Sequence, residues 1–244
     1  MLTQPTIDKL KELKLYGMAE AFLSLQNNVE SKAMSFEELF GIMVDREITV
    51  RYDKRQKRLL KAAKLRISEA CPEDINYEHI RGLERNKMIT LIQCDWIKQH
   101  QNVIFTGPCG IGKTYLACAL GQRACREGLS VHYFRMSQLF ELLRAAQAAG
   151  KYSALISKLS KIDLIILDDF GLGELSMTER QDLLEVLESR NGLRSTAVTT
   201  QLPIDLWYQY IGDAMIADAI LRRLLNCSHK IELEGEMLDQ KKAK

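Results

Sequence analysis

Residues 102–114 read NVIFTGPCGIGKT, and they restrict the kind of domain that this chain forms. The second part satisfies the pattern G-x-x-x-x-G-K-[ST] through Gly107, Gly112, Lys113 and Thr114. The apolar run NVIFT precedes the loop, and the helical pattern TYLACALGQRACREG follows it. A phosphate-binding loop requires this order of strand, glycine-rich loop and helix. The segment therefore predicts a nucleotide-binding α/β domain.

The residue types in the loop match the chemistry of a phosphate site. Glycines let backbone amides approach phosphate oxygens and form a nest around them. Lys113 is expected to place its ammonium against the β and γ phosphates, and the Thr114 hydroxyl to ligate Mg²⁺. The amino terminus of the following helix adds partial positive charge. The predicted nucleotide-binding residues are Gly107, Pro108, Cys109, Gly110, Ile111, Gly112, Lys113, Thr114 and Tyr115.

The composition is that of a globular protein. The chain has 244 residues, of which 46% are hydrophobic and 27% charged, and no apolar run approaches the roughly 18 residues of a membrane span. The first residues lack the continuous apolar core of a secretion signal, so we expect a cytoplasmic protein without membrane contact. The six cysteines form no CxxC pair and the four histidines are scattered, which indicates neither a zinc site nor a disulfide framework.

Strand-like and helical patterns alternate in the second part of the chain. The strand-like runs lie at 102–107, 131–136, 163–170, 195–203 and 230–235. Their alternation with helical patterns predicts a five-stranded parallel sheet covered by helices. Residues 1–70 show helical spacing only, and residues 71–86 contain Pro72 and many polar residues. We therefore expect a small all-helical domain over 1–70, a linker over 71–86 and an α/β domain over 87–244.

Two adjacent carboxylates end the apolar run IDLIILDDFG, residues 162–171. The chain between Lys113 and Asp168 is long enough to add a strand, an arrangement typical of P-loop hydrolases that carry a second acid. We expect Asp168 to hold Mg²⁺ and Asp169 to act as the base that polarises the attacking water. Two alternatives stay open: Asp169 caps the turn or helix near FGLGEL, or Glu174 serves as the base. Because aspartate is shorter than glutamate, we expect slow hydrolysis without a partner.

Four segments outside and around the loop resemble a known family. They are SFEELFGIMVDREITVRYDKRQKRLLKAAKLR, RGLERNKMITLIQCDWIKQHQNVIFTGPCGIGKTYLACAL, LIILDDFG and AVTTQLP. The chain is similar over nearly its whole length to the IstB-like proteins, ATP-binding helpers of insertion-sequence transposases. These belong to the AAA+ superfamily, near the helicase loader DnaC and the initiator DnaA. The resemblance implies an AAA+ core that uses ATP and Mg²⁺, ATP hydrolysis, ATP-dependent homo-oligomers, and binding of duplex DNA and a cognate transposase in the bacterial cytoplasm.

The resemblance also assigns roles to individual residues. Lys113 and Thr114 match the Walker A pair, and the two acids match Walker B. The segment TTQ, 199–201, occupies the sensor-1 place, where Gln201, or less readily Thr200, would hydrogen-bond the attacking water or the γ phosphate. The alternative for Gln201 is a turn residue before a proline.

Near the carboxyl terminus, the resemblance implies an arginine finger and shows two departures. In AILRRLLNCSHKIEL, Arg223 matches the arginine that relatives direct toward a neighbouring subunit's nucleotide, where it neutralises transition-state charge. Arg222 stands where an aspartate is usual, and GEMLDQKKAK replaces the usual Ser-Met-Arg stretch, so no sensor-2 arginine is assigned. Only nine residues follow Gly235 (244 minus 235), too few for a lid domain. We therefore expect a neighbouring subunit to help enclose the nucleotide.

A basic segment precedes the α/β domain. Residues 46–66 contain nine Lys or Arg against two acids, with apolar residues recurring at helical spacing. Such a helix is suited to bind a phosphate backbone with little sequence preference, although a solvated helix face is the alternative. The predicted DNA-binding residues are Arg51, Lys54, Arg55, Lys57 and Arg58.

Together these patterns predict an ATP-dependent, DNA-binding AAA+ ATPase that forms oligomers on duplex DNA and assists a transposase in target capture. A DnaC-like helicase loader and a nucleotide-gated DNA scaffold with negligible hydrolysis are the alternatives. A small-molecule kinase also needs a P-loop, but the short tail argues against its lid.

Overall fold

The chain folds into two compact units. The structure is a computed structural model that describes residues 3–77 and 81–235. One unit extends to Arg58, and the other begins at Leu59. No helix of the described residues is long and apolar enough to cross a membrane.

The first unit is entirely helical within the described residues. It contains α1 (Thr3–Glu12), α2 (Tyr16–Asn27), the 3₁₀ turn η1 (Glu30–Ala33) and most of α3 (Phe36–Ala63). A Cβ on Gly17 would lie 2.6 Å from the Cα of Glu47, so glycine permits α2 to approach α3 closely. The buried Glu47 carboxylate accepts hydrogen bonds from the amides of Gly17 and Met18 at 2.7 and 3.1 Å. It thereby satisfies donors that the first turn of α2 leaves unpaired.

The division between the units differs from the predicted boundary at residue 70. The end of α3 contributes the fully buried Ala63 to the core of the second unit, with Leu59 and Leu60 packed against it. The predicted linker 71–86 contains η2 (Pro72–Asp74), and its Ile75 is buried in the same core. These apolar contacts explain why residues 59–86 belong to the second unit by packing.

The second unit contains the five predicted strands in one parallel sheet. They are β1 (Asn102–Thr106), β2 (Val131–Arg135), β3 (Leu164–Phe170), β4 (Ser195–Thr200) and β5 (Ser228–Glu232). Their order is β2-β3-β4-β1-β5, and each neighbouring pair is parallel. Strand β4 therefore lies between the strand that leads into the phosphate loop and the strand that carries the acids. This spatial order confirms the five-stranded core expected from the sequence.

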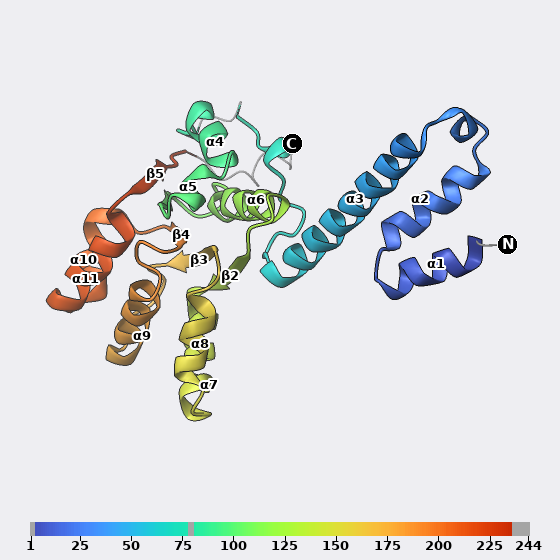
Figure 1. The fold of residues 1–244 in the computed structure, drawn as a ribbon. Helices are drawn as coiled ribbons and strands as arrows, with labels where there is room; N and C mark the ends of the chain where they lie inside the picture. The colour runs from blue at the N-terminus through green and yellow to red at the C-terminus, as the bar shows by residue number, and fades with distance from the viewer. Residues whose placement is uncertain (1–2, 78–80, 236–244) are drawn as a thin grey trace. The chain divides into compact units, whose positions relative to one another are not determined.

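Helices cover both faces of this sheet (Figure 1). One layer contains α4 (Arg85–Ile92), α5 (Asp95–Lys98) and α6 (Lys113–Arg126). The other contains α7 (Met136–Ala148), α8 (Tyr152–Leu159), α9 (Met177–Glu188), η3 (Ile204–Leu206), α10 (Trp207–Ile211) and α11 (Ala214–Leu225). Neighbouring residues of β1 serve opposite layers, with Phe105 in the first core and Ile104 in the second. The candidate functional site lies at the carboxyl ends of the strands.

Two details bear on the expectations from sequence. The continuous helical pattern over 137–160 is divided into α7 and α8, with Gly150 in a left-handed conformation (φ +65°) between them. Strand β5 ends at Glu232, and the expectation that no lid domain follows concerns residues 236–244, which lie outside the described residues.

Candidate functional site

The loop between β1 and α6 has the backbone of a phosphate nest. Gly107, Gly110 and Gly112 have φ values of +140°, +74° and +96°. A Cβ on Gly107 would lie 2.2 Å from the carbonyl oxygen of Leu233, so no other residue fits there without a backbone shift. Gly112 precedes the first residue of α6, which directs that helix's amino terminus at the loop. These conformations give the concave row of amides that binds phosphate.

Lys113 lies inside this loop. Its buried ammonium donates to the carbonyl oxygens of Gly107 and Pro108 at 2.7 and 2.6 Å. Burial lowers the pKa of Lys113, and nearby groups, including Cys109 and the two acids, oppose that shift. Two carbonyl oxygens of the phosphate loop thus hold the Lys113 ammonium within that loop.

The remaining predicted loop residues divide by exposure. Pro108, Cys109 and Gly110 are exposed, whereas Ile111 is buried in the core. The Tyr115 hydroxyl donates to the carbonyl oxygen of Cys71 at 3.3 Å. The Tyr115 side chain therefore contacts the segment that precedes α4.

A buried arginine supports the loop from behind. Arg81 donates to the carbonyl oxygens of Ile111 and Asn76 at 3.0 and 3.1 Å. Burial lowers the pKa of Arg81. The hydrogen bond from Arg81 to Ile111 fixes the middle of the loop. No pattern in the sequence predicted this contact.

A β-bulge brings the two acids to one side of the sheet. Strand β3 pairs with β4 through Leu167 opposite Val198 and Phe170 opposite Thr200, so Asp168 and Asp169 share the place opposite Thr199. Asp169 has φ +63°, a left-handed conformation that is uncommon for a residue other than glycine. Consecutive side chains of a regular strand point to opposite faces, and a bulge changes that alternation. The bulge explains how both carboxylates contact the same arginine.

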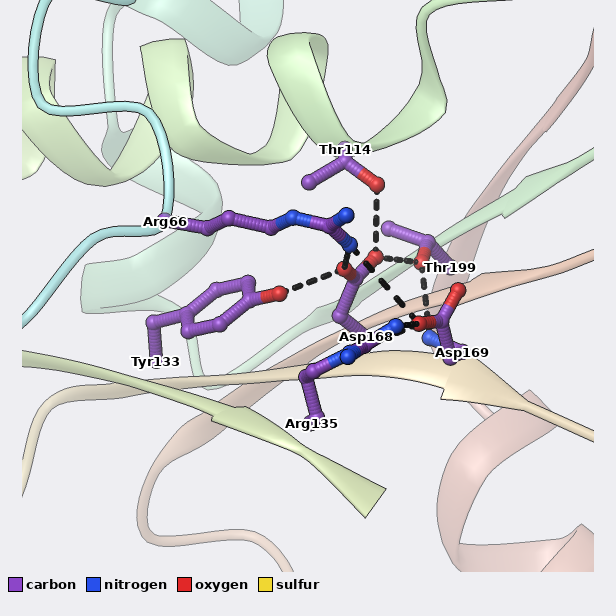
Figure 2. Close-up of polar contacts among 7 residues, drawn as sticks. All are labelled: Arg66, Thr114, Tyr133, Arg135, Asp168, Asp169 and Thr199. Atoms are coloured by element: carbon purple, nitrogen blue, oxygen red, sulfur yellow. Dashed lines mark hydrogen bonds and ion pairs between the residues drawn. The ribbon is translucent and has the colours of Figure 1, made fainter. Parts of the chain in front are cut away.

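Asp168 lies at the centre of a polar cluster (Figure 2). Its buried carboxylate accepts hydrogen bonds from the hydroxyls of Thr114 at 2.8 Å and Tyr133 at 2.5 Å, and from Thr199. Burial is the main cause that raises the pKa of Tyr133, and the hydrogen bond to Asp168 raises it further. The phenol therefore keeps its proton and donates it to the Asp168 carboxylate in a hydrogen bond. The Thr114 hydroxyl and the carboxylate are hard oxygen ligands, which fit Mg²⁺ completed by substrate phosphate and water.

Asp169 faces two arginines. Its Oδ2 lies 3.0 and 2.9 Å from Nε and Nη2 of Arg135, and 3.7 Å from Nη1 of Arg66. The side chain is 24% exposed, which leaves it accessible to water. The capping role that the sequence left open is filled by Ser176, which forms a capping box with Glu179 at the start of α9. Glu174, the other candidate base, is exposed in the connection before that helix.

On β4, the residue that contacts the acids is Thr199. Its hydroxyl contacts the Asp168 carboxylate and accepts a hydrogen bond from the Asp169 amide at 3.3 Å. Thr200 is turned toward the other side, where its hydroxyl donates to the carbonyl oxygen of Phe170 at 2.6 Å. Gln201 lies beyond the end of the strand and is exposed. The structure thus places neither Thr200 nor Gln201 in contact with the acids.

Arg223 lies at the opposite end of the sheet from the phosphate loop. Asn102, the first residue of β1, donates to the carbonyl oxygen of Arg223 at 2.8 Å, whereas the loop follows the last residue of that strand. Five residues of strand separate the two ends by about 15 Å. The Arg223 guanidinium pairs with Glu188 and donates to the Ala219 carbonyl at 2.7 Å. The Arg223 side chain is therefore held at the end of the sheet remote from the phosphate loop, and Arg222 beside it is exposed.

Sequence reasoning found the loop and the acids but missed the residues that hold the acids. These are Arg66, Tyr133, Arg135 and Thr199. Their contacts with Asp168 and Asp169 join residues far apart in sequence. Only the position of Thr199 within the TTQ segment offered a local signal.

The comparisons with known proteins agree on one family. The family model described as "IstB-like ATP binding protein" matches residues 8–244. The chain belongs to this family. An insertion sequence ATP-binding protein of Sinorhizobium fredii is 47% identical over 238 residues, covering 98% of this chain and 97% of the relative. The ATP-binding protein of insertion sequence IS1162 from Pseudomonas fluorescens is 45% identical, and the match covers 83% of this chain and 88% of that relative.

Solved structures support the AAA+ fold of this IstB-like chain. DnaI gives a TM-score of 0.58 at 20% identity and covers 75% of this chain and 98% of its own. The DnaC helicase loader gives 0.55 at 20% identity, with coverages of 67% and 96%. AMPPCP-bound DnaA from Aquifex aeolicus gives 0.57 at 15% identity, with coverages of 73% and 56%. At these identities the likeness establishes the fold alone.

The bulge depends on Thr199, and a conservative substitution tests that dependence. Thr199→Val keeps the branched shape but removes the hydroxyl that contacts Asp168 and the Asp169 amide. Leaving such buried groups unpaired costs about 1–3 kcal/mol, so we expect the free energy of unfolding to fall by that amount in chemical denaturation. Thr199→Ser keeps the hydroxyl, so its free energy of unfolding should stay close to that of the unchanged chain. A Thr199→Val protein as stable as the unchanged chain would contradict the role of this hydroxyl.

Proposed function

We propose that this IstB-like protein is an ATPase that assembles with ATP on duplex DNA and assists a transposase in capturing its target. The observation that carries the proposal is the bulged acid pair beside the phosphate loop. Asp168 contacts Thr114 of the loop, and Asp169 is the partly exposed neighbour on the same side. This arrangement provides one acid for a metal ion and one for water.

Residues of one subunit account for binding of the phosphates, binding of the metal ion and activation of water. The loop amides and Lys113 bind the β and γ phosphates, and Thr114 and Asp168 hold Mg²⁺. When bound, Mg²⁺ neutralises charge on the phosphates. Asp169 accepts a proton from the water whose oxygen attacks the γ phosphorus, and the bond from that phosphorus to the β–γ bridging oxygen breaks. The products are ADP and inorganic phosphate.

The position of Arg223 supports action between subunits. Its side chain lies with α9 and α11, at the sheet end remote from the loop of the same chain. A heterologous contact would bring this end of one subunit to the loop of the next. Arg223 then neutralises charge on the neighbour's transferring phosphoryl group. Hydrolysis is slow in an isolated subunit because that arginine is missing from its site.

The basic part of α3 supports binding of duplex DNA. Arg51, Lys54, Arg55, Lys57 and Arg58 are all exposed. Arg51 also pairs with Glu47 at 2.6 Å, and the Lys54 ammonium lies 4.2 Å from the centre of the Tyr16 ring. The five cations provide a sequence-independent site for phosphates. The predicted apolar face is itself open at Ile48 and Tyr52, which are 60% and 50% exposed.

Exposed apolar residues on the first unit support a protein partner. Phe36 and Phe40 stack with ring centres 6.0 Å apart while both remain exposed. Val29 and Leu13 are exposed as well. Exposed apolar surface of this kind is typical of protein interaction sites. We assign these exposed residues to contacts with the transposase or with another copy of the chain.

The relatives favour transposition over helicase loading. The named relatives from Sinorhizobium and Pseudomonas are insertion sequence ATP-binding proteins, whereas DnaC and DnaI share the fold at 20% identity. The two alternatives, a helicase loader and a nucleotide-gated DNA scaffold, predict different partners and activities. A loader must bind a replicative helicase, and a scaffold without useful hydrolysis should not turn over ATP on DNA.

Two substitutions separate nucleotide binding from hydrolysis. Asp169→Asn removes the base but keeps the loop, so we expect ATP-dependent assemblies on DNA that persist because hydrolysis is lost. Lys113→Ala removes the phosphate-binding ammonium, so we expect no such assemblies. Electron microscopy on duplex DNA, together with phosphate release, provides both readouts. Normal phosphate release by Asp169→Asn would refute its role as the base.

The salt dependence of DNA binding tests the basic helix. The double variant Lys57→Gln and Arg58→Gln removes two exposed cations of α3. If both contact phosphates, the slope of log K against log salt should decrease by about 2, and affinity should weaken similarly for unrelated sequences. Lys9→Gln with Lys11→Gln, two exposed cations of α1, is the matched control. An unchanged slope for the α3 variant would remove this helix from the DNA interface.

A further inference from the structure

Arg66 joins the end of the basic helix to both acids. It follows the last residue of α3, Ala63, by three positions. Its Nη1 lies 3.4 Å from Oδ2 of Asp168 and 3.7 Å from Oδ2 of Asp169 (Figure 2). Arg135, the other arginine at the site, forms its ion pair with Asp169. Arg66 is therefore placed to act on the metal-holding acid and on the base together.

The chain between α3 and Arg66 is packed against the nucleotide-binding core. Ala63 is fully buried, and Leu65 and Ile67 pack on the same core as α6. A Cβ added to Gly121 of α6 would lie 3.1 Å from Leu65, which shows how closely this segment approaches the helix. Only Lys64 and Leu65 separate the end of α3 from Arg66, so a displacement of that helix end would move the backbone that carries Arg66.

The side chain of Arg66 has room to leave the acids. It is 47% exposed and lines a cavity of about 480 Å³. The cavity is also lined by Lys64, His132, Tyr133, Phe134, Arg135, Gln138 and Leu142. Asp168 would keep its hydrogen bonds to Thr114, Tyr133 and Thr199 without Arg66. The acid pair thus has other supports when the guanidinium moves away.

The contacts of Arg66 oppose the chemistry proposed for the acids. A guanidinium at Asp168 repels a divalent cation that uses the same carboxylate. At Asp169, Arg66 is a second cation beside the oxygen that already pairs with Arg135. We therefore expect hydrolysis to be faster when Arg66 has withdrawn, chiefly because Asp168 is then free for the metal ion.

We propose that Arg66 is a positioning residue that couples DNA binding on α3 to ATP hydrolysis, an inference that rests on the proposed function. Without DNA, Arg66 pairs with Asp168 and Asp169 and restrains turnover. When duplex DNA engages the basic part of α3, the end of the helix shifts and withdraws Arg66 into the adjoining cavity. Asp168 is then available to Mg²⁺, and Asp169 keeps only its pair with Arg135, so ATP is hydrolysed faster on DNA.

The test compares three full-length variants with the unchanged protein. Arg66→Ala removes the restraint, Arg66→Lys keeps the charge, and Lys64→Gln removes a nearby exposed cation of the same cavity as the matched control. For each, phosphate release is measured with and without duplex DNA, and DNA affinity by fluorescence anisotropy. A fluorescent ATP analogue titrated with Mg²⁺ gives a readout that does not depend on turnover.

The coupling predicts a specific set of results. Arg66→Ala should raise the DNA-free rate about fivefold, the change that corresponds to a partly exposed ion pair of about 1 kcal/mol. DNA should then accelerate hydrolysis less than in the unchanged protein, because only the Arg223 supplied by assembly is left to add, although DNA affinity is unchanged. The Mg²⁺ midpoint of Arg66→Ala should be lower and independent of DNA. Arg66→Lys should retain part of the response to DNA, and Lys64→Gln all of it.

Different failures refute different statements. Intact DNA binding with the same acceleration by DNA in Arg66→Ala and the unchanged protein would overturn the coupling alone. Hydrolysis by the unchanged protein that does not respond to bound DNA would also overturn it. An unchanged protein that neither binds DNA nor hydrolyses ATP would instead contradict the proposed function.

Discussion

The hydrogen bonds of Thr199 hold the bulge on which the site depends. One hydroxyl contacts the carboxylate of Asp168 and the backbone amide of Asp169, and it comes from the strand that lies between the acid strand and the loop strand. This contact fixes a left-handed Asp169 that would otherwise be unfavourable. The bulge places both carboxylates on one side but in different surroundings: Asp168 contacts Thr114 of the loop, and Asp169 is partly exposed to water.

The same sheet separates the acids and the phosphate loop from Arg223. The loop and the acids lie at the carboxyl ends of the strands, whereas Arg223 lies beside the amino end of β1. Because a parallel sheet holds its two ends apart, the proposed role of Arg223 requires a second subunit. Within one chain, Asp169 is held by Arg135 and Arg66. Assembly and DNA binding would thus each supply something that a free subunit lacks: a cation for the phosphates, and the release of a cation from the acids.

The sequence was informative where the determinants are local. The phosphate loop, the five strands and the acid pair follow from spacing within short segments, and the structure has the loop and strands as expected. The contacts around the acids depend on strand register, because a bulge decides which threonine of TTQ faces them. Arg66 contacts Asp168, which lies 102 residues further along the chain. A periodic pattern within a short segment cannot predict a contact between such distant positions. The unit boundary differs from the predicted one because the apolar end of α3, which has the pattern of a helical domain, packs on the core of the second unit.

Mixing two inactive variants tests most directly whether the site is shared between subunits. Asp169→Asn keeps Arg223 but lacks the base, and Arg223→Ala keeps the base but lacks the finger. In random equimolar oligomers, about a quarter of the interfaces would join an intact base to an intact Arg223, since each subunit contributes a different end to a heterologous contact. We predict that ATP hydrolysis on duplex DNA, absent from each variant alone, appears in the mixture. Mixtures no more active than the sum of the two separate variants would contradict the shared site.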